Sequence, residues 1–254
     1  MPFPLAHPAA VLPFRRLQYL NFSALLIGAV TPDLSYCFKP YHLDVFAHTI
    51  RGCFGFSLPV GWLAVLIFQT IRDPLVSLLP APHRQALTRS ARAPDPPWFV
   101  VPLSVVLGSA THVFWDAFTH ETGWFVERSS FLQMKLFTLD GRHFRMYRLL
   151  WHISTWTGLF LLCRAYLQAL QKRTGSAQLF NPEERQRFAL WAAILALPLL
   201  GVLPFLVWRI ARDGLSLAAT LRSLTTSVAI YLVAVSVLLI AIGAGLKIRD
   251  RPGE

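Results

Sequence analysis

The chain has 254 residues, of which 54% are hydrophobic and 15% are charged, and its mean hydropathy is +0.47. This composition excludes an ordinary soluble domain and is typical of a polytopic membrane protein. The formal net charge of +11 does not indicate a nucleic-acid-binding protein, because Lys and Arg are spread over nearly every predicted loop and no basic-aromatic recognition motif interrupts the apolar runs. The expected partners are therefore membrane lipids and not nucleic acid.

The amino-terminal region contains two short apolar pieces, at roughly residues 5–18 and 21–36. Each piece contains proline, which argues against one continuous helix across the region. A hairpin of two short helices fits this pattern and places the start of the first helix beside the end of the second. We therefore expect His7 and Asp33 to meet. No basic segment precedes an apolar stretch that ends in a small-residue cleavage site, so we expect no cleaved signal peptide.

Five long apolar stretches follow, and each can cross a hydrocarbon core about 30 Å thick. They cover residues 53–71, 98–119, 149–170, 188–210 and 225–246. With the hairpin, they predict an all-α fold, a polytopic integral membrane helical bundle that forms a single membrane domain over residues 1–254. Within it, residues 1–152 form the candidate metal-site region, and residues 153–254 supply the C-terminal transmembrane helices.

The loop charges indicate an orientation in the membrane. If every stretch crosses the bilayer, one side (side A) collects more Lys and Arg than the other (side B), which favours side A as cytoplasmic. Met1 and Asp33 then lie on side B, which is extracytoplasmic, and Glu254 lies on side A. The sequence does not indicate an oligomeric state.

The segment GSATHVFWDAFTHETGW carries His112, Asp116 and His120 within or at the rim of an apolar stretch. Because a step of four residues offsets side chains by only about 40° on an α-helix, the three side chains lie along one face. Ionisable groups in membrane helices are costly and usually face a cavity or a partner. The same side B collects several more ionisable residues, which are His7, Asp33, His48 and His152. The sequence therefore predicts one polar pocket on side B.

Imidazole nitrogen and carboxylate oxygen are ligands that suit zinc in the first place, with Mn²⁺ and Fe²⁺ as alternatives. Thiolate ligation is not indicated, because Cys37, Cys53 and Cys163 have neither a C-x-x-C nor a zinc-ribbon spacing. A bound divalent ion lowers the pKa of its water towards neutrality and polarises a carbonyl or phosphoryl oxygen. The pattern therefore favours a hydrolytic metal site.

Each of these residues also has a structural interpretation. Asp33 after a proline suits a turn, His48 suits an interfacial loop, and His112 with Asp116 suits a purely structural hydrogen bond. A non-enzymatic membrane protein, such as a transporter or assembly factor, would use the same cluster for an ion path or a polar network. A transporter more naturally places polar groups near the midplane, whereas these lie at the rim, which favours an enzyme. The other histidines are expected in loops or at the interface, and they are His42, His83, His143 and His152.

Four segments carry a family resemblance, and they are AHPAAVLPFRRL, LLIGAVTPDLSY, FAHTIRG and LGSATHVFWDAFTHETGW. They resemble a bacterial integral-membrane family of unknown function, domain-of-unknown-function family 4184. That family is itself similar to the membrane-bound metal-dependent hydrolases and, more distantly, to zinc-dependent phospholipase C enzymes. The match covers roughly the first 150 residues.

The resemblance implies a metal-dependent hydrolase of the bacterial cytoplasmic membrane that acts on a lipid-derived or phosphoester substrate. The metal ligands that it implies are His7, Asp33, His48, His112 and Asp116. Asp116 is expected to hold the metal during catalysis, and His120 is a candidate proton donor to the leaving group. The segment FAHTIRG has one histidine where the broader group has two, which leaves the number of metal ions open.

Overall fold

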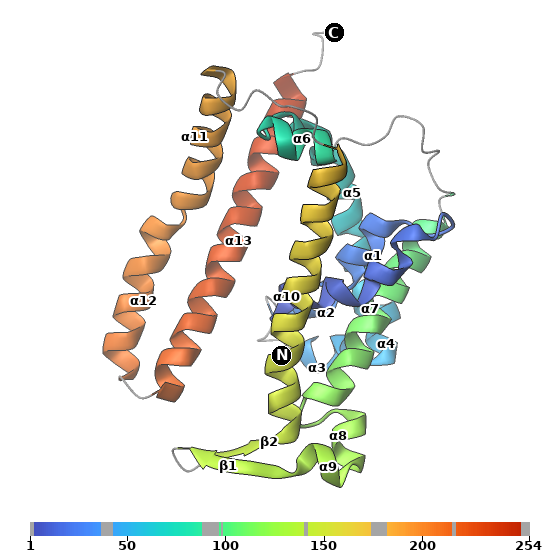
Figure 1. Ribbon diagram of the computed structural model, residues 1–254, viewed down its shortest axis with the longest axis vertical. Helices are drawn as coiled ribbons and strands as arrows, with labels where there is room; N and C mark the ends of the chain where they lie inside the picture. The colour runs from blue at the N-terminus through green and yellow to red at the C-terminus, as the bar shows by residue number, and fades with distance from the viewer. Residues whose placement is uncertain are drawn as a thin grey trace. The chain divides into compact units, whose positions relative to one another are not determined.

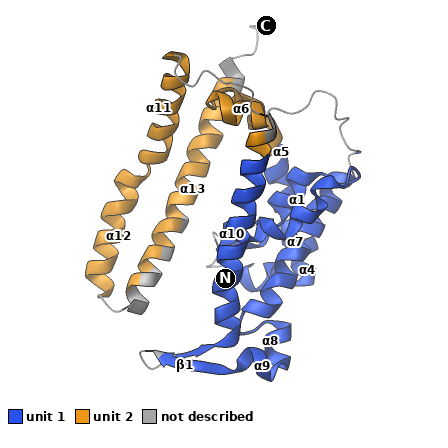
Figure 2. Cartoon of the chain, viewed as in Figure 1, with its two compact units in different colours: residues 1–66, 91–168 blue, residues 67–90, 169–254 orange. Residues whose placement is uncertain are grey.

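The structure, a computed structural model, describes residues 3–36, 43–87, 97, 99–139, 142–173, 182–214 and 217–249. This described part of the chain is helical apart from one antiparallel hairpin of two short strands, β1 (Lys135–Leu139) and β2 (Arg142–Arg145) (Figure 1). The chain divides into two compact units, Met1–Leu66 with Ala91–Gln168 (unit 1) and Ile67–Ser90 with Ala169–Glu254 (unit 2) (Figure 2). The predicted all-α helical class is confirmed.

Unit 1 begins with the predicted amino-terminal hairpin. Its elements are η1 (Pro4–Arg16), α1 (Phe22–Gly28) and α2 (Thr31–Leu34). η1 is a 3₁₀-helix with a proline at its start and two more, Pro8 and Pro13, within it, and proline lacks the N–H that an α-helical ladder needs. Val11 of η1 packs against Leu25 and Ala29, which closes the hairpin. Pro32 does not break the second piece, because it occupies the first turn of α2, where proline is tolerated.

A short helix and a longer continuous one follow. They are built from α3 (Leu43–Ala47), α4 (Ile50–Gly52), the π-helical turn η3 (Cys53–Ser57) and α5 (Leu58–Ser77), which continues into unit 2. The Thr49 hydroxyl caps α4 by accepting a hydrogen bond from the Gly52 N–H at 3.0 Å. A Cβ on Gly52 would lie 2.1 Å from the carbonyl oxygen of Phe46. This position therefore requires glycine, and the tight turn holds His48.

α7 (Val100–Thr119) lies along α1 in unit 1 (Figure 1). The two helices approach closely at glycines: a Cβ on Gly28 would lie 2.3 Å from the Val105 carbonyl oxygen, and one on Gly108 would lie 2.3 Å from the Leu25 carbonyl oxygen. Small residues allow such backbone contacts between membrane helices. The elements after α7 are α8 (Trp124–Arg128), α9 (Ser130–Gln133), the strand hairpin and α10 (Met146–Arg173).

Unit 2 contains the end of α5 and the helices α6 (Ala81–Leu87), α11 (Pro182–Ala196), α12 (Leu199–Asp213) and α13 (Leu217–Arg249). α11 is joined to α6 by polar contacts. The Glu184 carboxylate accepts a hydrogen bond from the Ala81 N–H at 2.6 Å and pairs with Arg84 at 3.1 Å. Trp191 donates to the Leu78 carbonyl oxygen at 3.1 Å. α12 and α13 pack against each other.

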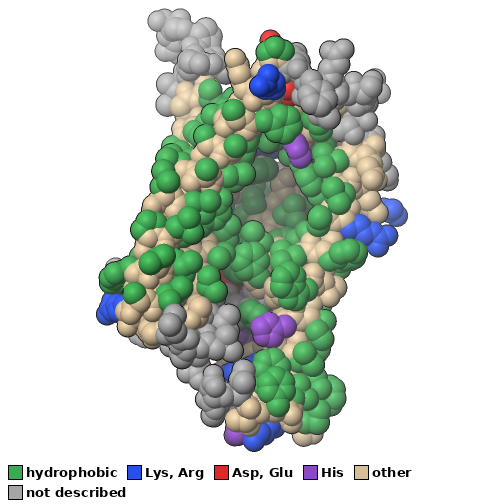
Figure 3. Space-filling view, turned by 60° about the vertical axis from the view of Figure 1, so that its left-hand side comes forward, with side chains coloured by type: hydrophobic (Ala, Val, Ile, Leu, Met, Phe, Trp, Pro, Cys, Tyr) green, Lys and Arg blue, Asp and Glu red, His purple; other side chains and the backbone are tan. Residues whose placement is uncertain are grey.

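Four segments of the described chain are long and apolar enough to cross a membrane, namely Ile50–Ser77, Val100–Arg128, Pro182–Asp213 and Thr226–Leu246. Many of their large hydrophobic side chains are exposed, and hydrophobic side chains cover most of the face shown in Figure 3. An exposed apolar surface of this kind is suited to contact with the hydrocarbon chains of lipids. These findings support a membrane protein.

The spans differ from the prediction in two places. The predicted span 149–170 coincides with α10, a helix of 28 residues that is not among the four candidates. Arg164 and several Ser and Thr residues interrupt its apolar sequence. The predicted span 188–210 lies across α11 and α12, which a turn at Leu197 and Pro198 separates.

Candidate metal centre

Unit 1 brings all five predicted ligands into one buried cluster. They are His7 on η1, Asp33 on α2, His48 directly after α3, and His112 and Asp116 on α7. Their donor atoms form two metal-capable groups, in each of which the atoms lie within 4.8 Å of one another. One group is His7, His112 and Asp116, the other is Asp33, His48 and His112, and His112 belongs to both. The exposed fractions of His7 and His112 are 3% and 0%, so water hardly reaches either ring. Segments up to 109 positions apart therefore supply one site.

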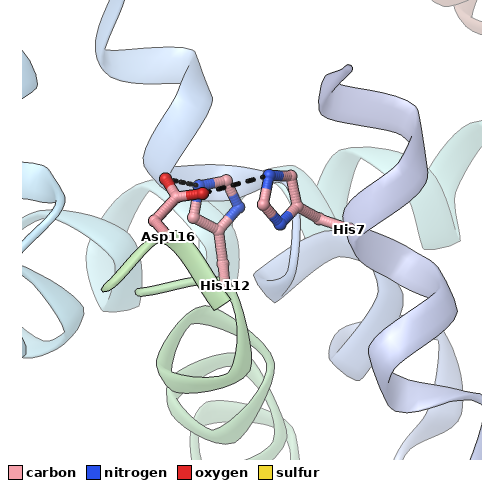
Figure 4. A group of neighbouring side chains, drawn as sticks. All are labelled: His7, His112 and Asp116. Carbon is pink, nitrogen blue, oxygen red and sulfur yellow. Dashed lines mark ion pairs between the residues drawn. The ribbon is translucent and has the colours of Figure 1, made fainter. Parts of the chain in front are cut away.

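The Asp116 carboxylate is the centre of this cluster. Its Oδ2 lies 3.3 Å from His112 Nε2 and 3.8 Å from His48 Nε2. Its Oδ1 lies 3.6 Å from His7 Nε2 and 3.4 Å from His120 Nδ1. Figure 4 shows His7 reaching from η1 towards the carboxylate, which shares one face of α7 with His112. The two oxygens thus face two different pairs of imidazole rings.

Asp33 completes a ring of four donor atoms on the Oδ2 side of Asp116. Asp33 Oδ1 lies 3.4 Å from His48 Nε2 and 3.6 Å from His112 Nε2. Four ligands arranged tetrahedrally around zinc, with bonds of about 2.0–2.2 Å, are separated from one another by roughly 3.3–3.6 Å. The four measured separations, 3.3–3.8 Å, are close to that spacing. Each of the two three-donor groups, His7 with His112 and Asp116, and Asp33 with His48 and His112, therefore has the spacing of a metal site, with Asp33 and Asp116 in different groups.

Hydrogen bonds to the backbone fix the tautomers of two histidines. His112 Nδ1 lies 2.8 Å from the Ala29 carbonyl oxygen, and His48 Nδ1 lies 2.7 Å from the Asp44 carbonyl oxygen. Because a carbonyl oxygen can only accept, Nδ1 carries the hydrogen in both rings, and in a neutral ring Nε2 presents a lone pair. Both Nε2 atoms face carboxylate oxygens, which also only accept. In metal sites, hydrogen bonds of this kind from the far ring nitrogen orient the metal-binding histidines.

The sequence builds this arrangement through the glycine contact of α1 and α7. Gly108 lets α7 approach the end of α1, and His112 follows one turn later on the same helix. The Ala29 carbonyl, which comes directly after α1, is thereby brought to hydrogen-bonding distance of His112. The close crossing therefore positions the ligand as well as the helix.

Many polar atoms of the cluster are buried without a hydrogen-bond partner among the described residues. They are both ring nitrogens of His7, both carboxylate oxygens of Asp116, Asp33 Oδ2, His112 Nε2 and His120 Nε2. Buried polar groups are nearly always satisfied in folded proteins, and a buried charge without a partner is costly. A cation at the centre of these donors would satisfy several of them at once. The residues therefore fit a metal ion.

His7 and His112 lie face to face, with ring centroids 3.7 Å apart. Burial and the neighbouring His112 ring hold the pKa of His7 well below its ordinary value. The neutral form of His7 is thereby favoured, and only a neutral imidazole nitrogen can bind a metal.

Tyr36 lies at the edge of the cluster, and the sequence prediction missed it. Its ring centroid is 5.5 Å from that of His48. Burial and the Asp33 carboxylate raise the pKa of the Tyr36 phenol, so it remains a hydrogen-bond donor. The available signal was its position three residues after Asp33, within the segment PDLSY.

Of the remaining histidines, one joins the cluster and the other described ones lie outside it. His120 joins the cluster through Asp116, since its Nδ1 lies 3.2 Å from the Asp116 carbonyl oxygen as well as close to the carboxylate. His152 packs against Phe144 and Trp151 and belongs to neither metal-capable group. Two predicted loop histidines lie in regular elements instead, His83 in α6 and His143 in β2, and His42 lies outside the described residues.

The fold and the cluster define a class: a helical membrane protein with a buried His/Asp group that could hold a metal ion. The chain belongs to the family described as "Domain of unknown function (DUF4184)", whose model matches residues 1–245. The match thus extends beyond the cluster into the C-terminal helices. No curated protein and no solved structure matches the chain.

Proposed function

We propose that this protein is a metal-dependent hydrolase of the bacterial cytoplasmic membrane that acts on a lipid-derived or phosphoester substrate. One observation carries the proposal: the Nε2 atoms of His48 and His112 both face the carboxylates of Asp33 and Asp116, while their Nδ1 atoms donate to backbone carbonyls. A cation between these lone pairs and carboxylates would satisfy both sets of atoms at once.

Charge favours a divalent ion in this position. Asp33 and Asp116 together carry two negative charges when ionised, and their exposed fractions are only 8% and 6%. A divalent cation would balance both while the histidines stay neutral. The competing arrangement, with protonated histidines, would need two charged imidazoles in the same buried space. Zinc is the first candidate for this His/Asp ligand set, with Mn²⁺ and Fe²⁺ as alternatives.

The residues divide into ligands and a proton donor. Asp33, His48, His112 and Asp116 would hold the ion, with His7 against the second oxygen of Asp116. When bound, the ion would activate water and polarise a phosphoryl or carbonyl oxygen. In phosphoester hydrolysis the water oxygen joins phosphorus and gives up a proton, the bond from phosphorus to the alcohol oxygen breaks, and the alcohol takes up a proton, so that no proton is gained or lost overall. His120 is the proposed donor of that proton.

Exposure indicates how a substrate would reach the cluster. The His48 and His120 side chains are 16% and 26% exposed, whereas His7 and His112 are enclosed. A head group would approach on the side of His48 and His120, where Tyr36 supplies a further hydrogen-bond donor. The excess of Lys and Arg on side A supports an extracytoplasmic position for this opening. The resemblance to the membrane-bound metal-dependent hydrolases supports the same reaction class.

Metal analysis tests the proposal. Protein purified in detergent and loaded with zinc is expected to retain at least one ion per chain after desalting. His112→Ala should lose most of it, because the variant removes a donor that belongs to both metal-capable groups. His143→Ala is the matched control, because His143 is exposed on β2 and outside the cluster. A wild-type protein without metal, or a His112→Ala variant that keeps it, would contradict the proposal and favour a structural polar network.

A further inference from the structure

An apolar cavity of about 840 Å³, open on one side so that the lining side chains Phe114 and Leu103 are 59% and 50% exposed, lies beside the metal centre within unit 1. η1, α7 and α10 form its walls. Its lining includes Ala10, Phe14, Leu103, Leu107, Phe114 and Leu161. Small residues of η1, Ala6, Ala9 and Ala10, line it, together with aromatic and leucine side chains, and Gly158 lets α10 pack closely against Ala6 of η1. A cavity of this size and lining is within the range that binds small ligands.

The polar groups in the lining are largely used by the helices themselves. The Thr111 hydroxyl donates to the Gly108 carbonyl oxygen at 2.7 Å, and the Ser154 hydroxyl donates to the Trp151 carbonyl oxygen at 3.0 Å. Hydroxyls bonded in this way offer little to a polar ligand. The cavity therefore suits an apolar group and not a sugar, a nucleotide or a peptide backbone.

The cavity meets the metal centre at His7. This residue lines the cavity and also lies 3.6 Å from Asp116, while the cavity residue Trp115 directly precedes Asp116 on α7. η1 is anchored at this end: the Phe3 N–H donates to the Thr155 hydroxyl at 3.2 Å. An apolar group in the cavity would thus be continuous with a head group at the cluster.

The length and direction of the cavity match a lipid chain. Its lining on α7 extends from Leu103 to Trp115, a distance of about 18 Å along the helix. One leaflet of a hydrocarbon core contributes about half of roughly 30 Å. Because α7 belongs to a candidate span, the cavity runs along the same axis as the chains of the surrounding lipid. The cavity is therefore slightly longer than the hydrocarbon of one leaflet, and an extended lipid chain could fill most of it.

We propose that the cavity binds the apolar chain of a single-chain phosphate ester, an amphiphile whose phosphate head group lies at the His/Asp cluster. The assignment of the head group rests on the proposed hydrolase function, whereas the assignment of the chain rests on the cavity alone. A binding site for an apolar chain favours a membrane amphiphile over a water-soluble phosphoester as the ligand. His7 lies at the junction between the two parts of the ligand.

Photocrosslinking tests the chain site without requiring turnover. The probe is dodecyl phosphate with a diazirine near the end of its chain, added to zinc-loaded wild-type protein in detergent. We expect crosslinks on peptides of η1, α7 and α10 that contain cavity residues. Leu161→Trp should reduce this labelling roughly tenfold, which corresponds to about 1.4 kcal/mol, because the larger ring occupies the cavity.

The neighbouring residue supplies the matched control. Phe160 is 63% exposed and does not line the cavity, so Phe160→Trp should leave the labelling unchanged. Leu103→Trp, on the opposite wall, repeats the test on a second helix. Labelling spread evenly over all lipid-facing helices, or equal labelling in Leu161→Trp and wild-type protein, would overturn the chain site.

A parallel hydrolysis assay separates this inference from the proposed function. Phosphate release is measured from dodecyl phosphate and from a water-soluble phosphoester, glycerol phosphate. Specific crosslinking without release from either substrate would leave the chain site standing and remove the hydrolase. Equal release from both substrates without cavity labelling would keep the hydrolase and remove the chain site. Faster release from dodecyl phosphate, lost in Leu161→Trp, would support both.

Discussion

At the scale of single residues, Asp116 and Asp33 have unequal positions in the cluster. Four imidazole rings surround the Asp116 carboxylate, whereas Asp33 meets two. Neither oxygen of Asp116 receives a hydrogen bond from the described residues. The negative charge of Asp116 is thus the one that a central cation would neutralise most directly.

Replacing each aspartate by asparagine should separate their contributions. Because asparagine keeps the shape and removes the charge, both variants should remain folded and bind zinc more weakly. We expect Asp33→Asn to lose at least the roughly 10- to 100-fold in affinity that the loss of a group supporting a metal ligand costs, and Asp116→Asn to lose more. Competition with a chelator of known affinity measures both values. A smaller loss in Asp116→Asn than in Asp33→Asn would remove Asp116 from the centre of the site.

The sequence was sufficient to predict which residues of the cluster lie close together, but not how their side chains are oriented. The four-residue spacing of His112 and Asp116 on a helix placed both on one face, and the hairpin brought His7 and Asp33 towards them. The orientation of His112 could not be predicted, because it depends on the Ala29 carbonyl of another helix. Such a contact arises from tertiary packing, which no local pattern encodes.

At the scale of elements, the crossing of α1 and α7 links helix packing to the metal centre. Gly28 and Gly108 allow backbone contact, and the same approach delivers the Ala29 carbonyl to His112. The sequence predicted both helices but not their glycine contact, because a glycine in a sequence does not show which other helix it packs against. The 3₁₀ geometry of η1 was not predicted either, because its prolines argued only against one continuous helix across the amino-terminal region.

Gly108→Ala should damage both the packing and the site. The new Cβ would lie 2.3 Å from the Leu25 carbonyl oxygen, so one helix must shift. Overpacking of this kind typically costs about 1–3 kcal/mol, and the shift should weaken zinc binding as the Ala29 carbonyl moves away. Thermal unfolding in detergent and zinc competition measure the two effects. Gly201→Ala is the control, because nothing lies within 4 Å of a Cβ there, and it should unfold at the same or a higher temperature.

Glu184 gives a separate prediction for unit 2. Its carboxylate accepts from the Ala81 N–H and pairs with Arg84, although the residue is only 6% exposed. Glu184→Gln removes the charge from these bonds and should lower the free energy of unfolding. Asp73→Asn is the control, because the Asp73 side chain is 83% exposed and its pair with Arg72 should contribute little. Equal unfolding temperatures for the two variants would contradict this role of Glu184.

At the scale of the whole molecule, the number of spans decides the position of the site relative to the membrane. The four candidate spans confirm the membrane character of the chain, and the apolar runs predicted it because hydrophobic length is a local property of sequence. α10 is the exception, since Arg164 and its hydroxyl residues weaken the apolar signal. Whether α10 crosses the bilayer determines whether the two ends of the chain lie on the same side of the membrane or on opposite sides.

We expect α10 to cross, which places Met1 and Asp33 on side B and Glu254 on side A. A helix of 28 residues is about 42 Å long, more than the roughly 30 Å that a span requires. In a cysteine-free background, Pro2→Cys and Pro252→Cys should therefore react with a membrane-impermeant maleimide from opposite sides. Reaction of both from the same side would mean that α10 does not span and that the orientation inferred from loop charges is wrong. If Pro2→Cys reacts from the cytoplasm and Pro252→Cys from outside, α10 still spans, but the metal centre opens to the cytoplasm and its substrate must come from the inner leaflet.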